Sequence, residues 1–216
     1  MKKIILFFVA TMFVASSFAQ SEKYLNTMRE KVAAVDTTWD VTKLKELSAA
    51  FERIADAEKD QWLPYYYAAL TQINAVMMTG MSGAPDAAVT DPMTDKAEEL
   101  LNKAEALSKD NSEIYVVRKM IATARMMVDP MNRYQTYGPQ AEAALATAKK
   151  LNPDNPRVYI LEGQDKFYTP EQFGGSKEQA KALFEEAQKK FETFKPASDI
   201  DPDWGRNTLQ YFLTQF

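Results

Sequence analysis

A four-position pattern recurs along the chain and constrains its fold more than any other feature. A small or apolar residue is followed by an apolar residue four positions later, another three positions later, and an aromatic residue eleven positions after that. The complete copies are Leu47, Phe51, Ile54 and Tyr65; Ala97, Leu101, Ala104 and Tyr115; and Ala141, Leu145, Ala148 and Tyr159. The first three positions of each copy share one helix face, so the pattern predicts stacked helix pairs.

The length of the repeat varies in an informative way. A fourth copy, Ala180, Phe184 and Ala187, has Ser198 where the aromatic residue is expected. The turn between pairs keeps one length in the three complete copies, so the variation must lie inside the pairs. We expect long loops at residues 79–94, 129–138 and 169–175, emerging on one edge. They carry Met81, Met93, Met131, Tyr134, Tyr137 and Phe173.

The sequence predicts helices with recognisable start signals. Their ranges are 22–35, 42–57, 63–78, 95–108, 112–128, 139–151, 156–168, 176–194 and 203–214. Asp95 and Pro139 are placed as helix starts, and Ser176 with Gln179 fits a capping box. Asp203 is predicted to cap the last helix, which is expected to cover the open end of the array.

The inter-pair turn resembles that of a known repeat family. Residues 149–156 read Lys-Lys-Leu-Asn-Pro-Asp-Asn-Pro, and Tyr159 with Gly163 has the aromatic-to-glycine spacing of the tetratricopeptide repeat. Tyr65 with Ala69 also matches, whereas Tyr115 with Lys119 departs because Lys replaces a small residue. Residues 41–194 therefore resemble exported tetratricopeptide-repeat proteins of Gram-negative bacteria.

This resemblance implies an all-α, right-handed superhelical solenoid of about four helix pairs plus a C-terminal capping helix. An irregular helical bundle with coincidental alanines is the alternative.

The N-terminus has the features of a cleavable signal peptide. Lys2 and Lys3 precede an apolar run at residues 4–14, and Ser17 and Ala19 stand at the −3 and −1 positions of a cleavage site. The run is too short for a transmembrane anchor. We predict a signal peptide at residues 1–19, cleavage after Ala19, a helical repeat domain at 20–216, and a periplasmic or secreted location.

The composition argues against several classes of function. The 216 residues include no Cys and no His, so thiolate and His-based catalytic machinery and ordinary zinc sites are excluded. The net charge of −4 gives no support for nucleic-acid binding. A hydrolase using an Asp/Glu pair has no local signature. We therefore expect a non-enzymatic protein without a cofactor.

The resemblance also implies a binding surface. Tetratricopeptide-repeat proteins bind peptides or extended segments along the groove lined by the first helix of each pair. Positions one, five and nine after each aromatic residue are then expected to face the groove. The predicted partner-binding residues are Tyr66, Leu70, Asn74, Met120, Gln164 and Tyr168. This set has no cationic clamp for a carboxylate terminus, and its expected partner is a protein or peptide of the cell envelope.

Two other interpretations remain open. The Met- and Tyr-bearing loops form an alternative surface for a small ligand, or for Cu(I) through the clusters Met77, Met78, Met81 and Met126, Met127, Met131. The string Asp199-Ile200-Asp201-Pro202-Asp203 resembles the start of a calcium loop, but Trp204 and Gln210 stand where Gly and Glu are needed.

The signal peptide can be tested by mass. Protein recovered from the envelope fraction is expected to lack its first 19 residues, because Ser17 and Ala19 direct cleavage before Gln20. Intact-mass spectrometry measures this loss, and a membrane-embedded species that retains Met1 would contradict it.

Overall fold

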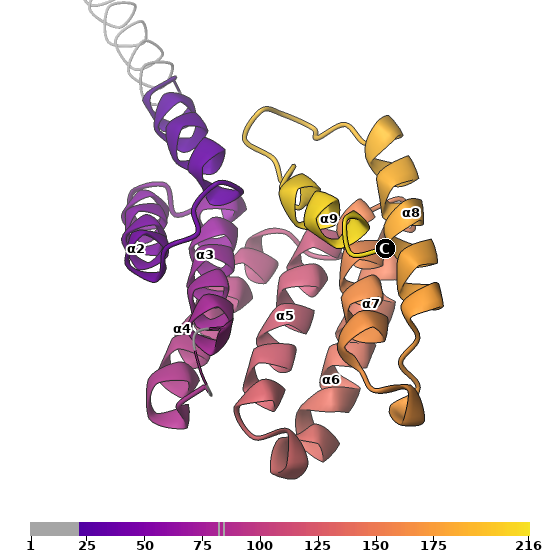
Figure 1. Cartoon of the computed structure of the whole chain (residues 1–216). Helices are drawn as coiled ribbons and strands as arrows, with labels where there is room; N and C mark the ends of the chain where they lie inside the picture. Colours follow the sequence, from indigo (N-terminus) through magenta and orange to yellow (C-terminus); the bar gives the residue numbers. More distant parts are fainter. Residues whose placement is uncertain (1–21, 82, 84) are drawn as a thin grey trace, which may run out of the picture.

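The computed structural model describes residues 22–81, 83 and 85–216, and in these residues it contains helices and no strand (Figure 1). The predicted signal peptide lies outside the described residues. A first helix spans residues 22–35. It is followed by α2 (Val41–Ala57), α3 (Trp62–Met81), α4 (Ala87–Leu107), α5 (Ser112–Val128), α6 (Pro130–Leu151), α7 (Pro156–Tyr168), the 3-10 turn η1 (Glu171–Phe173), α8 (Lys177–Thr193) and α9 (Arg206–Leu213).

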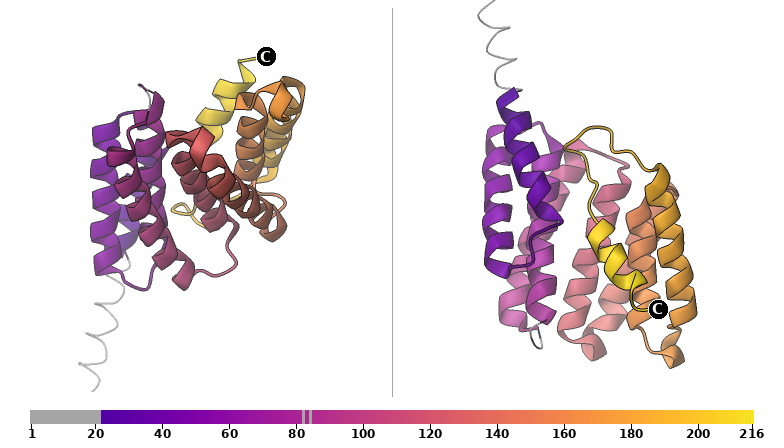
Figure 2. Two further views of the ribbon diagram at one scale, coloured as in Figure 1. Left: turned by 90° about the horizontal axis from the view of Figure 1, so that it is seen from below. Right: turned by 45° about the horizontal axis from the view of Figure 1, so that its top comes forward.

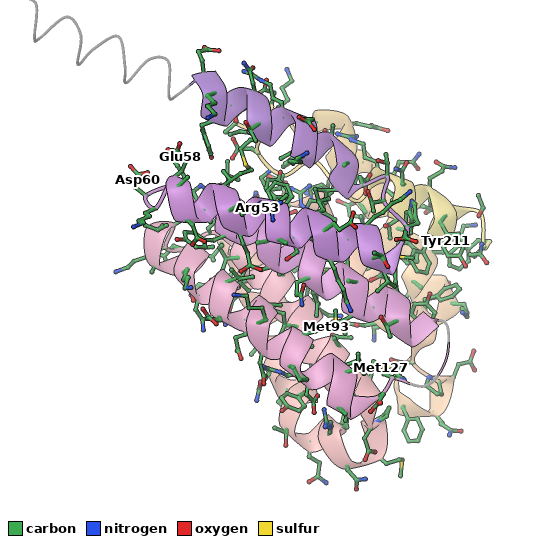
Figure 3. The ribbon with its side chains drawn as sticks, turned by 90° about the vertical axis from the view of Figure 1, so that its left-hand side faces the viewer. Arg53, Glu58, Asp60, Met93, Met127 and Tyr211 are labelled. Carbon is green, nitrogen blue, oxygen red and sulfur yellow. The ribbon has the colours of Figure 1, made fainter. Side chains whose placement is uncertain are left out.

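The helices are arranged as consecutive antiparallel pairs. α3 packs on α4, α5 on α6 and α7 on α8, and α5 also contacts both α3 and α7. The first helices of these pairs therefore lie side by side with α5 in the centre, as Figures 1 and 2 show. Figure 3 shows Glu58 and Asp60, in the turn between α2 and α3, at the opposite end of the array from Met127.

The repeated residues form the contacts between the helices. Phe51, Ala97, Leu101, Ala104, Ala148 and the fourth-copy residues Ala180, Phe184 and Ala187 are all completely buried. The carbonyl at the third position also ends each helix in the same way. The Ile54, Ala104 and Ala148 carbonyls accept the backbone N–H of the residue four positions later at 2.8, 2.9 and 3.0 Å. The repeat therefore specifies both the packing face and the turn.

Two residues of the tetratricopeptide-like pattern have a clear structural role. A Cβ at Gly163 would lie 2.7 Å from the ring of Phe184, so glycine is needed for α7 to approach α8 closely. Lys119, which departs from the pattern, has a buried side chain whose ammonium contacts the Asp165 carboxylate at 2.6 Å. An ion pair between α5 and α7 thus replaces the close contact of a small residue.

Two of the three predicted loops are mostly helix, so the predicted starts at Asp95 and Pro139 are wrong. α4 begins at Ala87 and α6 at Pro130, because Asp86 and Asp129 cap them by accepting the backbone N–H of Ala88 and Asn132. Pro92 and Pro139 lie inside these helices.

Arg133 binds Asp91 through two hydrogen bonds of 2.7 and 2.8 Å, which join the added first turns of α4 and α6. A bidentate ion pair between the two helices thus supports the extra length that local sequence signals did not reveal.

The last helix also differs from its prediction. α9 begins at Arg206, and its N-cap is Gly205 in a left-handed conformation with φ of 105°, not Asp203. Such a conformation favours glycine. α9 packs on α8, and its Phe212 ring stacks on the Phe184 ring with 4.7 Å between the ring centroids. The non-helical segment before α9 crosses the array. The capping box before α8 is present on one side, since Ser176 Oγ accepts the Gln179 N–H.

The helix contact at Ala148 yields a stability prediction. Ala148→Leu is expected to lower the free energy of unfolding by about 1–3 kcal/mol, because a completely buried alanine leaves no room for three more carbons. Ala146→Leu, an exposed position on the same helix, is the matched control and should change stability little. Urea denaturation measures both, and equal values for the two variants would show that Ala148 is not at a tight contact.

Candidate binding site on the inner face of the helix array

One face of α5 is turned toward both neighbouring first helices. Glu113, Met120 and Met127 are spaced by seven residues and therefore share this face. The Glu113 carboxylate accepts hydrogen bonds from Arg157 of α7 and from Tyr66 of α3. Arg118 instead contacts Glu105 of α4 from another side of α5. The Glu113 face is thus directed away from α4.

The same face continues onto the neighbouring helices by helical spacing. We define the inner face as Tyr66, Leu70, Asn74 and Met77 of α3, Glu113, Met120 and Met127 of α5, and Arg157, Gln164 and Tyr168 of α7. Glu113 contacts both Tyr66 and Arg157, so these three residues mark a common level on the three helices. From that level Met77, Met127 and Tyr168 lie about 16 to 21 Å further along, at the other end.

The C-terminal strap, residues 194–205, covers the first part of the inner face. It has no helix, and its backbone accepts hydrogen bonds from Tyr67 through the Ile200 carbonyl at 2.9 Å and from Arg157 through the Trp204 carbonyl at 3.3 Å. The Trp204 indole N–H donates to the Tyr66 hydroxyl at 2.8 Å. The strap therefore binds to α3 and α7 together.

A buried ion pair lies beneath the strap. The Arg157 side chain is completely buried, and its guanidinium donates to Glu113 at 2.6 and 2.8 Å. Asn155 also donates to Glu113 at 2.8 Å. The Arg157 guanidinium lies 4.7 Å from the Phe194 ring centroid and 5.6 Å from that of Trp204, which are both strap residues. The cation is thus enclosed by one carboxylate and two aromatic rings.

The electrostatics of this cluster favour the charged form of Arg157 and the protonated form of Tyr66. Burial acts to lower the pKa of Arg157, but the charge of Glu113 and its hydrogen bonds outweigh this and leave the pKa raised. Burial, followed by the charge of Glu113, raises the pKa of the Tyr66 hydroxyl. Arg157 therefore stays charged and Tyr66 stays protonated, so both remain donors to Glu113.

The strap divides the predicted binding residues into two groups. Tyr66 and Leu70 are completely buried, so neither offers surface to a partner. Met120 is nearly buried, Asn74 and Gln164 are half-buried, and Tyr168 is 67% exposed. Helical spacing puts all six residues on the inner face as defined, and their burial shows that only its far part is open.

The groove prediction did not include three residues of this region. Met77 and Met127, which the sequence analysis considered only as Cu(I) ligands, are 38% and 49% exposed near the ends of α3 and α5. The seven-residue spacing from Leu70 and Met120 was the signal that could have added them to the groove. Tyr211 of α9 is 57% exposed, and it lies near the end of α7 because its ring contacts Phe212, which in turn contacts the Tyr168 ring. No periodic signal links α9 to α7. The predicted loop residues Met131, Tyr134 and Phe173 are exposed, but none is on the inner face as defined.

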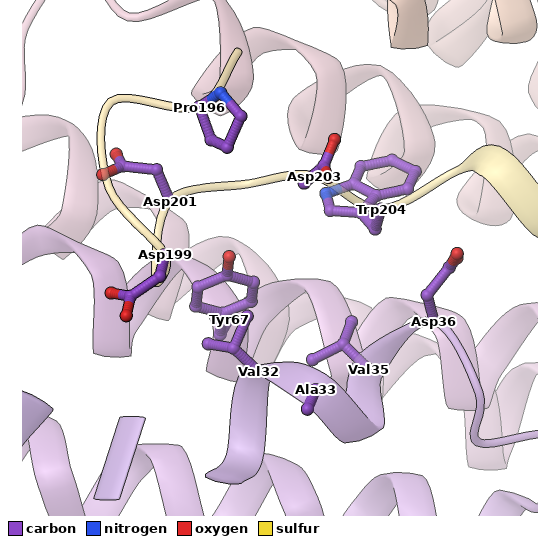
Figure 4. A pocket seen from close by; sticks show the side chains of 10 residues that line it. All are labelled: Val32, Ala33, Val35, Asp36, Tyr67, Pro196, Asp199, Asp201, Asp203 and Trp204. Carbon is purple, nitrogen blue, oxygen red and sulfur yellow. The ribbon is translucent and has the colours of Figure 1, made fainter. Parts of the chain in front are cut away.

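A cavity of about 270 Å³ lies between the strap and the first helix (Figure 4). Its walls include Val32, Val35, Tyr67 and Trp204, and its carboxylates are already bound. Asp36 accepts the Gly205 N–H, and Asp199, Asp201 and Asp203 contact Arg29, Ser198 and Arg206 respectively. Within residues 22–81, 83 and 85–216, no group of three or more acidic residues is placed to hold a metal ion. The acidic string is thus used in fastening the strap.

Comparison with solved structures connects this array to a known protein. The HusA haemophore from Porphyromonas gingivalis superposes with a TM-score of 0.77 at 36% sequence identity, over 89% of this chain and 92% of that one. This chain belongs to the HusA haemophore family. The relationship to HusA concerns the helical array as a whole rather than one motif. No family model and no curated protein matches the sequence. No helix in the described part of the chain is long and apolar enough to cross a membrane.

The buried ion pair yields a second stability prediction. Glu113→Gln is expected to lower the free energy of unfolding by about 3–5 kcal/mol, because it leaves the Arg157 guanidinium buried without a countercharge. Glu105→Gln, which removes the partly exposed partner of Arg118, is the matched control and should cost less than about 1 kcal/mol. Chemical denaturation followed by circular dichroism measures both. Similar losses in the two variants would mean that the inner ion pair has no special role.

Proposed function

We propose that this chain is an exported, non-enzymatic binding protein that carries haem or a related tetrapyrrole on the open part of the inner face. The observation that carries the proposal is the 36% identity to a haemophore over nine-tenths of both chains. The signal peptide predicted from Lys2, Ser17 and Ala19 supports export.

The chemistry of the open part fits a flat, apolar ring. Met77, Met127, Tyr168 and Tyr211 present thioether and aromatic groups, and each is more than a third exposed. Thioethers adapt to irregular apolar ligands, and tyrosine rings stack on planar ones. Asn74 and Gln164, which are half-buried on the same face, can donate hydrogen bonds to polar substituents.

The composition of the chain bears on how the ligand is held. The sequence has no His and no Cys, so these two ligands of haem iron are absent from the whole chain. Recognition should then rest mainly on the ring itself. We expect haem and iron-free protoporphyrin to bind with dissociation constants within about tenfold of each other, which is a difference of about 1.4 kcal/mol.

We further infer that the helix pairs form a tetratricopeptide-like right-handed superhelix in which the inner face is the concave side. The turn hydrogen bonds at Ile54, Ala104 and Ala148 and the close approach at Gly163 support this arrangement. A solenoid of this kind presents several first helices to one ligand, which matches the three helices of the inner face.

An extended peptide of an envelope protein is a second candidate ligand, favoured by the strap. This non-helical segment lies on the inner face and accepts hydrogen bonds from Tyr67 and Arg157 through its backbone. The same face thus receives extended polypeptide within the molecule. A co-purifying peptide that competes with protoporphyrin would support this candidate.

The proposed site is tested by adding charge to it. Met127→Asp should weaken haem binding at least tenfold, because it places a carboxylate beneath the apolar ring. Met131→Asp is the matched control, since Met131 is 90% exposed at the start of α6 and outside the inner face. Absorbance titration of the Soret band gives the dissociation constants, and circular dichroism confirms that both variants fold.

Two results would reject this assignment. Haem that fails to bind the unaltered protein would remove the proposed function. Equal effects of Met127→Asp and Met131→Asp would show that the ligand does not bind on the open part of the inner face. A combined Tyr134→Ala and Phe173→Ala variant would then test whether it binds at the alternative surface that these two exposed residues form.

A further inference from the structure

The methionines of the described chain differ sharply in exposure. Met28 is completely buried, and Met93 and Met120 are 8% and 9% exposed. Met77 and Met127 are 38% and 49% exposed, and both lie on the open part of the inner face. Met131 is the most exposed at 90%, but it lies outside that face. The open part is therefore lined by thioethers that a dissolved reagent can reach.

The two inner-face thioethers lie at a similar level on adjacent helices. Tyr66 and Glu113 are hydrogen-bonded, so they set a common origin on α3 and α5. Met77 is eleven residues beyond Tyr66, and Met127 is fourteen beyond Glu113. At 1.5 Å per residue these positions differ by about one helical turn along the two helices. In the proposed site the ring lies across both side chains.

We propose that Met77 and Met127 are an oxidation-sensitive modification site, and that their conversion to sulfoxides by a hydroperoxide releases the ligand. The inference rests on the proposed tetrapyrrole site and adds its regulation. Each sulfur takes one oxygen atom from the peroxide, whose O–O bond breaks. The sulfur loses two electrons, and the peroxide leaves as water or an alcohol.

The physical effect follows from the change in polarity. A thioether is apolar and polarizable, whereas a sulfoxide carries a strong S=O dipole that needs a hydrogen-bond donor when it is covered. The half-buried polar residues of the open part are Asn74 and Gln164, which the proposed function assigns to polar substituents of the ligand, so no further donor of this kind is assigned to the sulfoxides. Covering an unpaired polar group is unfavourable, so the ring should bind more weakly. Enzymatic reduction of the sulfoxides would restore the site.

The test uses the mature protein and iron-free protoporphyrin IX, so that no iron reacts with the oxidant. The protein is treated with hydrogen peroxide, freed of it by desalting, mapped by peptide mass spectrometry and titrated. Met77 and Met127 are expected to gain oxygen before Met93, and the dissociation constant should rise at least tenfold. Methionine sulfoxide reductase should return it to the starting value.

Two variants localise the effect. A Met77→Leu and Met127→Leu double variant has no sulfur to oxidise at either position, so its dissociation constant after peroxide treatment should equal the value measured for the same variant before treatment. Met131→Leu is the matched control and should lose affinity as the unaltered protein does.

The outcomes separate this inference from the function on which it rests. Protoporphyrin that does not bind before treatment would reject the proposed function, and this inference with it. Normal binding before treatment, followed by unchanged affinity with both residues oxidised, would reject the inference alone. A loss that also occurs in the double variant, or oxidation of Met93 ahead of Met77 and Met127, would reject it as well.

Discussion

The buried contact between Arg157 and Glu113 is the interaction on which the rest of the inner face depends. A guanidinium without solvent is tolerated only because a carboxylate and two aromatic rings enclose it. Those partners come from α5 and from the strap, so satisfying one charge fixes α5, α7 and the strap relative to one another. Tyr66 extends the network to α3 by donating to Glu113 and accepting from Trp204. The architecture of the binding face is thus specified by polar contacts, while the helix pairs behind it are specified by apolar ones.

Helical periodicity was sufficient to predict much of the fold. Small residues such as Ala104 and Ala148 at regular spacing revealed the packing face, because close helix contacts exclude larger side chains. The starts of α4 and α6 were wrong because Asp86 and Asp129 gave early caps and because Arg133 supports the added turns through a residue 42 positions away. Local signals at Asp95 and Pro139 were real but weaker than that tertiary contact.

The candidate site was predictable only in part, for a related reason. The helical spacing of Tyr66, Met120, Gln164 and Tyr168 in the sequence predicted that they share one face. It could not predict which segment of the chain covers that face. The strap has no periodic pattern, and its contacts with residues 29–67 join positions 133 to 170 apart. Only the folded structure shows that Tyr66 supports the strap while Met77, Met127 and Tyr168 remain open.

The strap has a consequence for how the molecule gains and loses its structure. In an open stack of repeats each unit contacts its neighbours only, and the ends can fray independently. Here Asp36 accepts the Gly205 N–H and Arg29 contacts Asp199, so the two ends of the chain form one closed circuit. Contacts between such distant segments slow folding, because the conformational entropy of the long intervening chain is lost before these contacts contribute any stabilisation. Once closed, the circuit makes the array a single cooperative unit, in which a protease cut near residue 195 would loosen the first helix as well as the last.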